Sequence, residues 1–349
     1  MKAVVKTEPG PGHLAYTTVP DPTPAPDEVV IGVRATGICG TDISFYDWAE
    51  DTVREYRPQL PVVMGHEFAG EVAAVGRAVQ NFRPGDRVTA NPILYCRACP
   101  YCRAGRTNVC LDRPILGLGR PGCFAEYVAV REENVFPLPA GVPYDIAAMS
   151  EVLCVGLHAV ERAAPEPGDV VAIIGPGPLG MILLVAARAA GASPIAMIGL
   201  AADAERLRLA EELGAVPINA EAQDPAAALR DLTGGLGPDI VFEAAGHPAA
   251  VPDAIRLVRR GGRVGVLGLG HVPSTFNTAE LVYKEVELIG SRAYTPATWR
   301  RLPSMLAAQR SLLAHLATHR LPFERAAEGI ELMKARKGLK ILFTPEWAH

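Results

Sequence analysis

Hydrophobic residues in the middle of the chain form short, continuous apolar runs separated by longer amphipathic segments. Five runs predict buried strands, at residues 170–174, 195–198, 240–242, 264–267 and 286–289. Three intervening segments predict helices, at residues 179–190, 203–213 and 248–259. Asp203 is a candidate N-cap of the second helix and Gly214 is a candidate stop. Because strands and helices alternate, this region predicts a parallel sheet covered on both faces.

The flanking regions have a different pattern. In residues 1–155, short β-type runs are broken by Pro and Gly clusters, which predicts a loop-rich, mostly β domain. Its clearest strands are expected at residues 28–35, 68–75, 87–90 and 125–130. From residue 292 onward the pattern is mixed. There Thr295-Pro296 predicts a helix start, residues 324–337 a second helix and residues 340–344 a closing strand.

Composition limits the classes of function. The chain has 349 residues, 49% of them apolar, and its net charge of −4 with no basic run gives no indication of a nucleic-acid partner. The longest apolar stretch, residues 181–187, is too short to cross a bilayer, and the N-terminus has no signal-peptide pattern. We therefore expect a cytoplasmic protein without membrane contact. Its seven cysteines would stay reduced there, which favours metal or catalytic roles.

Four of the cysteines follow one another with the spacing C-x2-C-x2-C-x7-C: Cys96, Cys99, Cys102 and Cys110. Four thiolates can close a tetrahedral shell around zinc with no open position, which is typical of a structural site. An iron–sulfur cluster is the main alternative, but the spacing lacks the ferredoxin pattern.

Three more potential metal ligands lie on two short motifs. Cys39 belongs to residues 37–42 (Gly-Ile-Cys-Gly-Thr-Asp), and His66 and Glu67 belong to residues 65–67 (Gly-His-Glu). Thiolate, imidazole and carboxylate all bind zinc, and catalysis requires a three-ligand shell with an open position. Each residue alone would indicate a core or structural role. Together, beside a cofactor-binding fold, they indicate a catalytic metal site.

A glycine motif marks the cofactor-binding region. Gly175, Gly177 and Gly180 form a G-x-G-x-x-G pattern between the strand at 170–174 and the helix that opens at Leu179. Such glycines permit a tight turn and a close backbone approach, and the helix N-terminus receives a pyrophosphate. The motif therefore predicts dinucleotide binding.

On these motifs the chain resembles, over its full length, the zinc-dependent medium-chain dehydrogenase/reductase superfamily, and within it the L-threonine 3-dehydrogenase and sorbitol (polyol) dehydrogenase branch. Residues 39–42, residues 65–67, the four-cysteine segment and residues 120–127 carry this resemblance. It implies an α/β fold in which a GroES-like, mostly β catalytic domain accompanies a Rossmann domain with a doubly wound parallel sheet. The implied extents are residues 1–155 for the catalytic domain with a structural zinc lobe at about 92–112, residues 156–291 for the Rossmann domain, and residues 292–349 for a return to the catalytic domain.

The resemblance also implies roles for individual residues. Cys39 and His66 match the ligands of a catalytic zinc. Glu67 matches an acid that lies beside this zinc and ligates it in some states, and Glu151 matches a further acidic ligand or its water-linked partner. Which of the two acids ligates directly stays open. Thr41 matches the hydroxyl that takes the substrate proton.

The chain departs from these relatives in two places. One concerns the path by which the substrate proton leaves Thr41, and the other concerns the choice of cofactor. Many relatives carry a histidine five residues after the catalytic cysteine, where this chain has Ser44, so we expect a changed pH profile. The acid that binds a ribose 2′-hydroxyl about twenty residues after the glycine turn is also missing. Arg206 would suit a 2′-phosphate, whereas Asp203 would serve the ribose if the loop is longer by one residue. NAD and NADP both stay open.

The resulting expectation is hydride transfer between NAD(P) and a secondary alcohol, such as a polyol, an amino alcohol or a threonine-like substrate. It includes two zinc ions per chain and a homodimer or homotetramer paired at the sheet edge near residues 286–289. The alternatives are a quinone- or enoyl-reductase-like member without catalytic zinc and a non-enzymatic binding relative. The expected cofactor-binding residues are Gly175, Gly177, Pro178, Leu179, Gly180, Gly199, Arg206, Ala245, Leu267 and Gly268.

Overall fold

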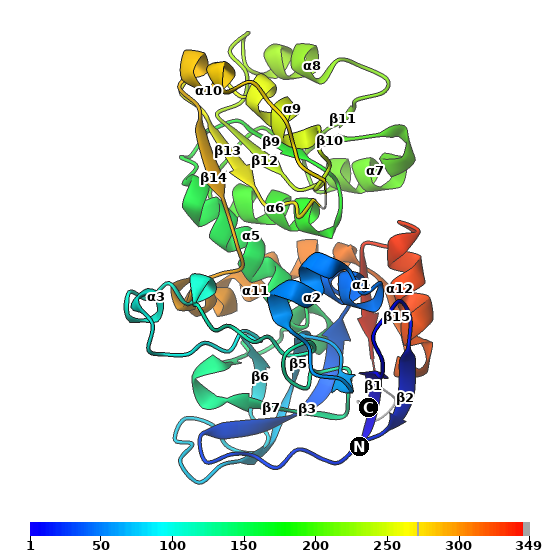
Figure 1. Ribbon diagram of the computed structural model, residues 1–349. Helices are drawn as coiled ribbons and strands as arrows, with labels where there is room; N and C mark the ends of the chain where they lie inside the picture. Colours follow the sequence, from blue (N-terminus) through cyan, green and yellow to red (C-terminus); the bar gives the residue numbers. More distant parts are fainter. Residues whose placement is uncertain (271, 345–349) are drawn as a thin grey trace. The chain divides into compact units, whose positions relative to one another are not determined.

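The computed structural model describes residues 1–270 and 272–344. The chain divides into two compact units (Figure 1): Met1–Cys154 with Thr295–His349 form unit 1, and Val155–Tyr294 form unit 2. Helix α5 (Ser150–Ala163) begins in unit 1 and continues into unit 2.

Unit 1 is built on two mostly antiparallel sheets. The larger one has seven strands in the order β15-β16-β3-β5-β6-β8, with β7 also paired to β3. Its strands are β3 (Glu28–Gly37), β5 (Glu67–Val75), β6 (Arg87–Ala90), β7 (Tyr127–Arg131), β8 (Val135–Pro137), β15 (Ala317–Leu321) and β16 (Lys340–Phe343). The smaller sheet has the order β2-β1-β4, with β1 (Lys2–Lys6), β2 (Leu14–Thr18) and β4 (Val62–Val63).

The long helix α11, several short helices and an aromatic cluster complete unit 1. The rings of Phe124, Phe323 and Phe343 have centroids 5.1 to 6.3 Å apart and fix the C-terminal segment on the sheet. The helices are α1 (Gly40–Tyr46), α2 (Glu50–Tyr56), α3 (Pro100–Arg103), α4 (Tyr144–Ala147), α11 (Pro296–Leu316) and α12 (Ala326–Lys334), with 3-10 turns η1 (Thr107–Val109), η2 (Glu132–Asn134) and η4 (Phe323–Arg325).

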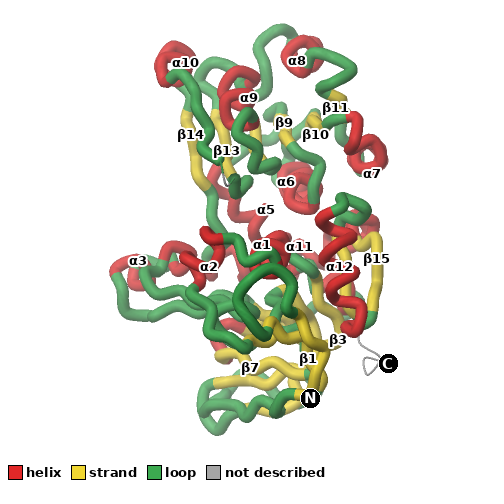
Figure 2. Tube along the Cα trace, turned by 45° about the vertical axis from the view of Figure 1, so that its right-hand side comes forward, coloured by secondary structure: helices red, strands yellow, loops and turns green. Residues whose placement is uncertain are grey.

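Unit 2 is a six-stranded parallel sheet with the order β11-β10-β9-β12-β13-β14. Figure 2 shows its strands side by side with helices around them. The chain runs outward from β9 in one direction and then from β12 in the other, so the order reverses between these two strands. The elements are β9 (Val171–Ile174), α6 (Pro178–Ala189), β10 (Ile195–Gly199), η3 (Ala201–Asp203), α7 (Ala204–Glu212), β11 (Val216–Asn219), α8 (Pro225–Leu232), β12 (Ile240–Glu243), α9 (Ala250–Leu257), β13 (Arg263–Val266), α10 (Thr278–Lys284) and β14 (Glu287–Gly290).

Both faces of this sheet are buried because side chains of one strand alternate between two cores. Ala172 of β9 packs with residues of α8 and α9, including Leu229 and Ile255. Ile173, the next residue, faces α6, where a Cβ added to Gly180 would lie 3.5 Å from it. This alternation explains why the strands read as continuous apolar runs rather than as alternating ones.

The predicted fold class, a doubly wound parallel sheet with a mostly β partner, is confirmed. Thr295 accepts a hydrogen bond from the Thr298 N–H at 3.3 Å, as expected of the cap that starts α11. Gly214 follows α7 with φ +89°. Asp203 is the N-cap residue of α7, as expected, but its carboxylate makes no capping bond to the helix backbone and accepts the N–H of Leu200 at 3.1 Å. In the described residues, no helix has both the length and the apolarity that crossing a membrane requires.

Candidate metal centres and dinucleotide site

The pairing of two strands brings the first two potential ligands of unit 1 together. β3 and β5 are antiparallel, and their last matched pair is Gly37 with Glu67. Cys39 therefore follows the end of β3 at the place where His66 precedes the start of β5. The ligand atoms of Cys39, His66 and Glu151 all lie within 4.8 Å of one another.

Glycine at position 65 makes this approach possible. Gly65 has φ +88°, a conformation that side chains rarely adopt, and a Cβ there would lie 2.0 Å from the Phe124 ring. The backbone before His66 consequently packs directly on the aromatic cluster. Glu151 comes from the first turn of α5 and is 7% exposed, so it is a buried helical carboxylate rather than a loop residue.

One buried carboxylate links two members of this group. Asp42 Oδ1 lies 3.3 Å from His66 Nδ1, and Asp42 Oδ2 accepts the Cys39 N–H at 2.9 Å. Burial lowers the pKa of His66, but the charge interactions and hydrogen bonds with Asp42 and Cys39 outweigh burial and hold that pKa well above its usual value. With Nδ1 facing Asp42, Nε2 is the ring nitrogen left for a metal. No role was predicted for Asp42, although it belongs to the motif at residues 37–42.

Glu67 does not belong to the three-residue group. Its carboxylate forms a buried ion pair with Lys340 of β16, and the Lys340 ammonium also donates to the Ile38 carbonyl at 2.9 Å. Burial lowers the pKa of Lys340, but Glu67, Cys39 and Glu151 together raise it above its usual value. The lysine therefore stays charged and occupies one side of the Glu67 carboxylate. From the sequence, Lys340 was predicted only to belong to a strand. Its pairing with Glu67 could not be predicted, because the two residues are 273 positions apart.

Two hydroxyl residues lie on the helix that follows Cys39. Thr41 Oγ1 is 3.8 Å from Cys39 Sγ. Ser44 is three residues further along α1, so its side chain lies on the same face of the helix as that of Thr41. Both are partly exposed. The arrangement offers two successive hydroxyls that lead away from the Cys39 sulfur.

The four cysteines of the predicted lobe converge around α3 and η1. The Sγ–Sγ separations are 3.4 Å for Cys96–Cys110, 3.5 Å for Cys99–Cys102, 3.8 Å for Cys99–Cys110 and 3.9 Å for Cys96–Cys102. Four sulfurs at about 2.3 Å from a tetrahedral zinc would be about 3.8 Å apart. The sulfur positions therefore match the size of a zinc shell.

The electrostatics of this lobe also favour a cation. Backbone N–H groups of Leu111 and Cys102 lower the pKa of the Cys99 thiol to about 6, and the N–H groups of Ala98 and Cys99 lower that of Cys96. Burial raises the pKa of Cys102 to about 12, and its hydrogen bonds with Cys110 and Cys99 act in the same direction. Four thiolates this close need a bound cation to ionise together.

In unit 2 the glycine turn lies between β9 and α6. Gly175 has φ +102°, and a Cβ on Gly180 would lie 1.9 Å from the Gly175 carbonyl, so the turn and the helix start are in close contact. A Cβ on Gly177 would meet nothing within 4 Å. Gly177 is the N-cap of α6, and Pro178 is in its first turn. The open side of Gly177 therefore leaves room for a phosphate at the helix N-terminus.

The other expected cofactor residues lie at the carboxyl ends of neighbouring strands. Gly199 ends β10, Ala245 follows β12, and Leu267 and Gly268 follow β13. The buried Glu243 joins two of these loops, since it accepts the N–H groups of Ala245 at 2.8 Å and of Gly268 at 3.1 Å. These positions border the point where the strand order reverses, which is where doubly wound sheets bind ligands.

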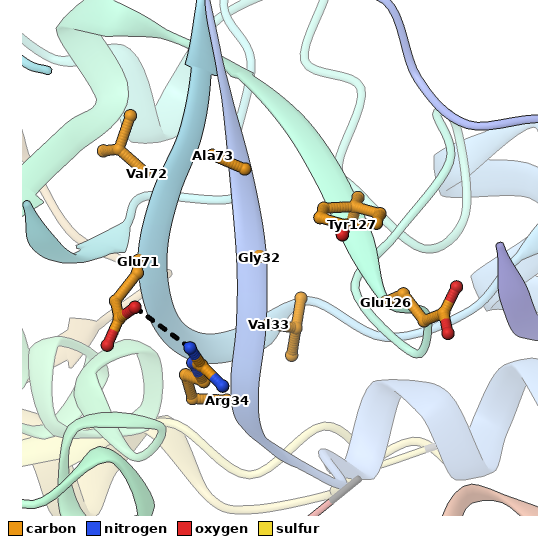
Figure 3. Close-up of a pocket in the computed structure, with 8 residues that line it drawn as sticks. All are labelled: Gly32, Val33, Arg34, Glu71, Val72, Ala73, Glu126 and Tyr127. Carbon is orange, nitrogen blue, oxygen red and sulfur yellow. Dashed lines mark hydrogen bonds and ion pairs between the residues drawn. The ribbon is translucent and has the colours of Figure 1, made fainter. Parts of the chain in front are cut away.

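Figure 3 shows a separate cavity in unit 1, about 260 Å³ in volume, over β3, β5 and β7. Its charged residues are largely paired: Arg34 lies 3.0 Å from Glu71, which also accepts the Tyr144 hydroxyl at 2.7 Å. The Tyr144 hydrogen bond and Arg34 lower the pKa of Glu71, although burial opposes them. None of the residues expected to bind metal or cofactor lines this cavity.

Comparison with known proteins gives two family models that match the chain. Residues 25–140 match the alcohol dehydrogenase GroES-like domain, and residues 178–308 match the zinc-binding dehydrogenase model. The sorbitol dehydrogenase of Halalkalibacterium halodurans is 36% identical and the L-threonine 3-dehydrogenase of Bacillus velezensis is 38% identical, each over 99% of both chains. The solved structure of a zinc-binding dehydrogenase from Sinorhizobium meliloti 1021, bound to NADP, has 32% identity and a TM-score of 0.90 and covers 99% of each chain.

Proposed function

The chain belongs to the zinc-dependent medium-chain dehydrogenase/reductase superfamily, and from this premise we propose that it oxidises secondary alcohols at a zinc ion held by Cys39, His66 and Glu151. It is an alcohol dehydrogenase that uses NAD or NADP. The observation that carries the assignment of the site is the convergence of a thiolate, an imidazole and a carboxylate within 4.8 Å. Three ligands of these types leave an open fourth position for a substrate oxygen.

The residues around this group can divide the chemistry among them. Zinc bound there would act as a Lewis acid and lower the pKa of the substrate alcohol. Asp42 fixes the imidazole of His66 so that Nε2 is the ligand. The Thr41 hydroxyl, 3.8 Å from the Cys39 sulfur, would accept the proton of the alcohol as it gives its own proton to Ser44. Ser44 then passes the proton toward solvent.

Glu67 is assigned a supporting role in this proposal. Its pairing with Lys340 argues for an anion that lies beside the zinc site and is held away from it, with Glu151 as the direct acidic ligand. A second zinc is proposed in the shell of Cys96, Cys99, Cys102 and Cys110, where four sulfurs leave no open position and the role is structural.

Unit 2 is proposed to bind the dinucleotide at the glycine turn. The pyrophosphate would lie at the N-terminus of α6, next to the open side of Gly177, and the loops after β10, β12 and β13 would flank the two nucleosides. The cofactor supplies the hydride acceptor, and the protein supplies orientation.

The proposed substrates are small secondary alcohols: polyols, amino alcohols and β-hydroxy amino acids such as threonine. The named relatives include a sorbitol and an L-threonine 3-dehydrogenase, which supports this range without selecting a member of it. We also propose that copies of the chain associate into a dimer or tetramer through the edge strand β14.

The test combines metal counting with a substrate panel. We expect two zinc ions per native chain by elemental mass spectrometry, and one per chain in the Cys39→Ser variant. The native enzyme should oxidise at least one class among polyols, amino alcohols and L-threonine with NAD or NADP, and Cys39→Ser should lose that activity. Native protein that holds only one zinc, or Cys39→Ser that keeps full activity, would overturn the proposed site.

A further inference from the structure

The carboxyl end of β10 lacks the acid that dinucleotide-binding folds of this type use to bind the ribose. β10 ends at Gly199, and the next three residues are Leu200, Ala201 and Ala202. An acidic side chain near this point accepts the 2′-hydroxyl of NAD and repels the 2′-phosphate of NADP. By sequence alone, the choice between the two cofactors is therefore undetermined.

The structure brings a carboxylate to this point from the next strand. Glu221, in the turn between β11 and α8, accepts the N–H of Ala201 with Oε2 at 2.7 Å. Asn219 fixes that turn, because its Oδ1 accepts the Glu221 N–H at 3.0 Å. The Ala220 N–H also donates to the Gly199 carbonyl at 2.9 Å. Two of these bonds thus hold the Glu221 turn against the end of β10, and the Asn219 bond fixes the turn itself.

This position is adjacent to the glycine turn. A Cβ on Gly199 would lie 2.9 Å from Pro176, which stands between Gly175 and Gly177 of the glycine motif. Figure 1 shows β10, β11 and α7 as neighbours on one side of unit 2. A dinucleotide whose pyrophosphate lies on the glycine turn would therefore bring its adenosine ribose toward Ala201 and the Glu221 carboxylate.

Arg206, a nearby base that would suit NADP, is already matched by an acid. Arg206 Nη1 lies 4.0 Å from Asp203 Oδ1, and both side chains are largely buried. Asp203 in turn accepts the Leu200 N–H at 3.1 Å, so it is held in place on the same turn. The positive charge of Arg206 is offset by Asp203, whereas the Glu221 side chain is exposed.

We propose that Glu221 replaces the missing acid and makes the enzyme prefer NAD to NADP. Its carboxylate accepts a hydrogen bond from the ribose 2′-hydroxyl of NAD, and it repels the 2′-phosphate of NADP, which carries negative charge at neutral pH. This inference rests on the proposed function in one respect: the dinucleotide binds at the glycine turn of unit 2.

The test measures cofactor binding directly. NADH and NADPH are titrated separately into native protein, into Glu221→Gln and into Glu221→Lys, and dissociation constants are read from the fluorescence of the bound dihydronicotinamide. Glu211→Gln is the matched control, because it removes the same charge from an exposed position at the far end of α7. Measurements at low and high salt separate local contacts from the effect of net charge.

We expect native protein to bind NADH about tenfold or more tightly than NADPH, a ratio of the size that one close charge can produce. Glu221→Gln should reduce that ratio to near one, Glu221→Lys should reverse it, and Glu211→Gln should leave it unchanged. Native protein that prefers NADPH, or a preference that Glu221→Gln and Glu221→Lys do not alter, would overturn the inference. Failure of both cofactors to bind would instead overturn the proposed dinucleotide site.

Discussion

At the scale of single residues, the buried pair of Glu67 and Lys340 is the least expected feature of the metal region. Both side chains are almost fully excluded from solvent, at 0% and 4% exposure. A Cβ at Gly37 would lie 2.5 Å from Glu67 Oε2, so the carboxylate occupies space that a glycine at position 37 leaves open. The pair therefore forms a neutral unit beside the proposed zinc, and neither charge is tolerable there alone.

Removing only the lysine should destabilise the protein strongly. In Lys340→Met the Glu67 carboxylate is left buried without its partner, which costs about 3–5 kcal/mol of unfolding free energy in comparable cases. Adding Glu67→Leu removes the stranded charge, so the double variant should recover most of that loss. Denaturant unfolding of native, single and double variants measures both values. If the double variant is as unstable as Lys340→Met, the ion pair is not the source of the effect.

The hydroxyl at position 44 gives a prediction about pH. A serine cannot hold a proton near neutral pH, whereas a histidine has an ordinary pKa of about 6.5. In Ser44→His a titrating group would join the path that leads from Thr41 to solvent. The pH dependence of kcat should gain an inflection between about pH 6 and 8, with turnover rising as the imidazole loses its proton and can accept one. Ser44→Asn is the control, and an unchanged profile in Ser44→His would refute the relay.

The sequence identified the residues that a short motif marks and missed those that tertiary structure supplies. Cys39 and His66 stand in recognisable segments, and strand register brings them together. Lys340 and Glu221 carry no local signal, because each acts through a partner on another element. Asp42 belongs to the motif at residues 37–42. Its role in orienting His66 depends on the position of the His66 ring, which the spacing of residues along the chain does not predict.

At the scale of elements, the four-cysteine lobe depends on its ligands more than on its own secondary structure. α3 has four residues and η1 has three, both far too short to be stable alone. N–H bonds to sulfur hold the loop, such as Cys99 N–H to Cys96 at 3.3 Å and Cys102 N–H to Cys99 at 3.5 Å. We therefore expect the shape of the lobe to depend on the proposed metal shell.

Loss of one sulfur should open this lobe without unfolding the sheets. Cys99→Ser is expected to lower the zinc content by one ion per chain and to expose the segment to trypsin after Arg103 and Arg106, both exposed. The control is Ala98→Ser, which adds a hydroxyl to the same exposed loop and keeps all four sulfurs. Mass spectrometry of the fragments and of the zinc content gives the result. A Cys99→Ser protein with full zinc and no new cleavage would contradict the structural role.

The sequence predicted the parallel strands of unit 2 more fully than the rest, and the reason is physical. Strands buried on both faces need apolar residues at every position, so β9, β10 and β12 read as unbroken runs. β11 was not predicted from the sequence. It contains Pro217 and lies at the edge of the sheet, where not every position has to be apolar. α5 was not predicted either. It begins at Ser150, inside the region predicted to be mostly β, where Glu151 was considered only as a candidate ligand.

At the scale of the whole molecule, the edge strand β14 of the parallel sheet is the place where we propose that copies of the chain associate. β14 is the last strand in the order, and Leu288 on it is 41% exposed. The Glu287 N–H donates inward to the Gly262 carbonyl and the Ser291 N–H donates inward to the Val266 carbonyl. Because N–H directions alternate along a strand, the N–H of Leu288 points outward, away from β13.

This geometry allows a substitution that attacks association and spares the fold. Leu288→Pro removes an outward N–H that pairing between copies would use, while the bonds from β14 to β13 remain. We expect native protein to sediment as a dimer or larger, Leu288→Pro to shift toward monomer, and Leu288→Ala to shift much less, because it keeps the N–H. NADH binding by Leu288→Pro should be retained, which separates dissociation from unfolding. Association through β14 is excluded if the native chain is monomeric, or if Leu288→Pro folds and sediments as the native protein does.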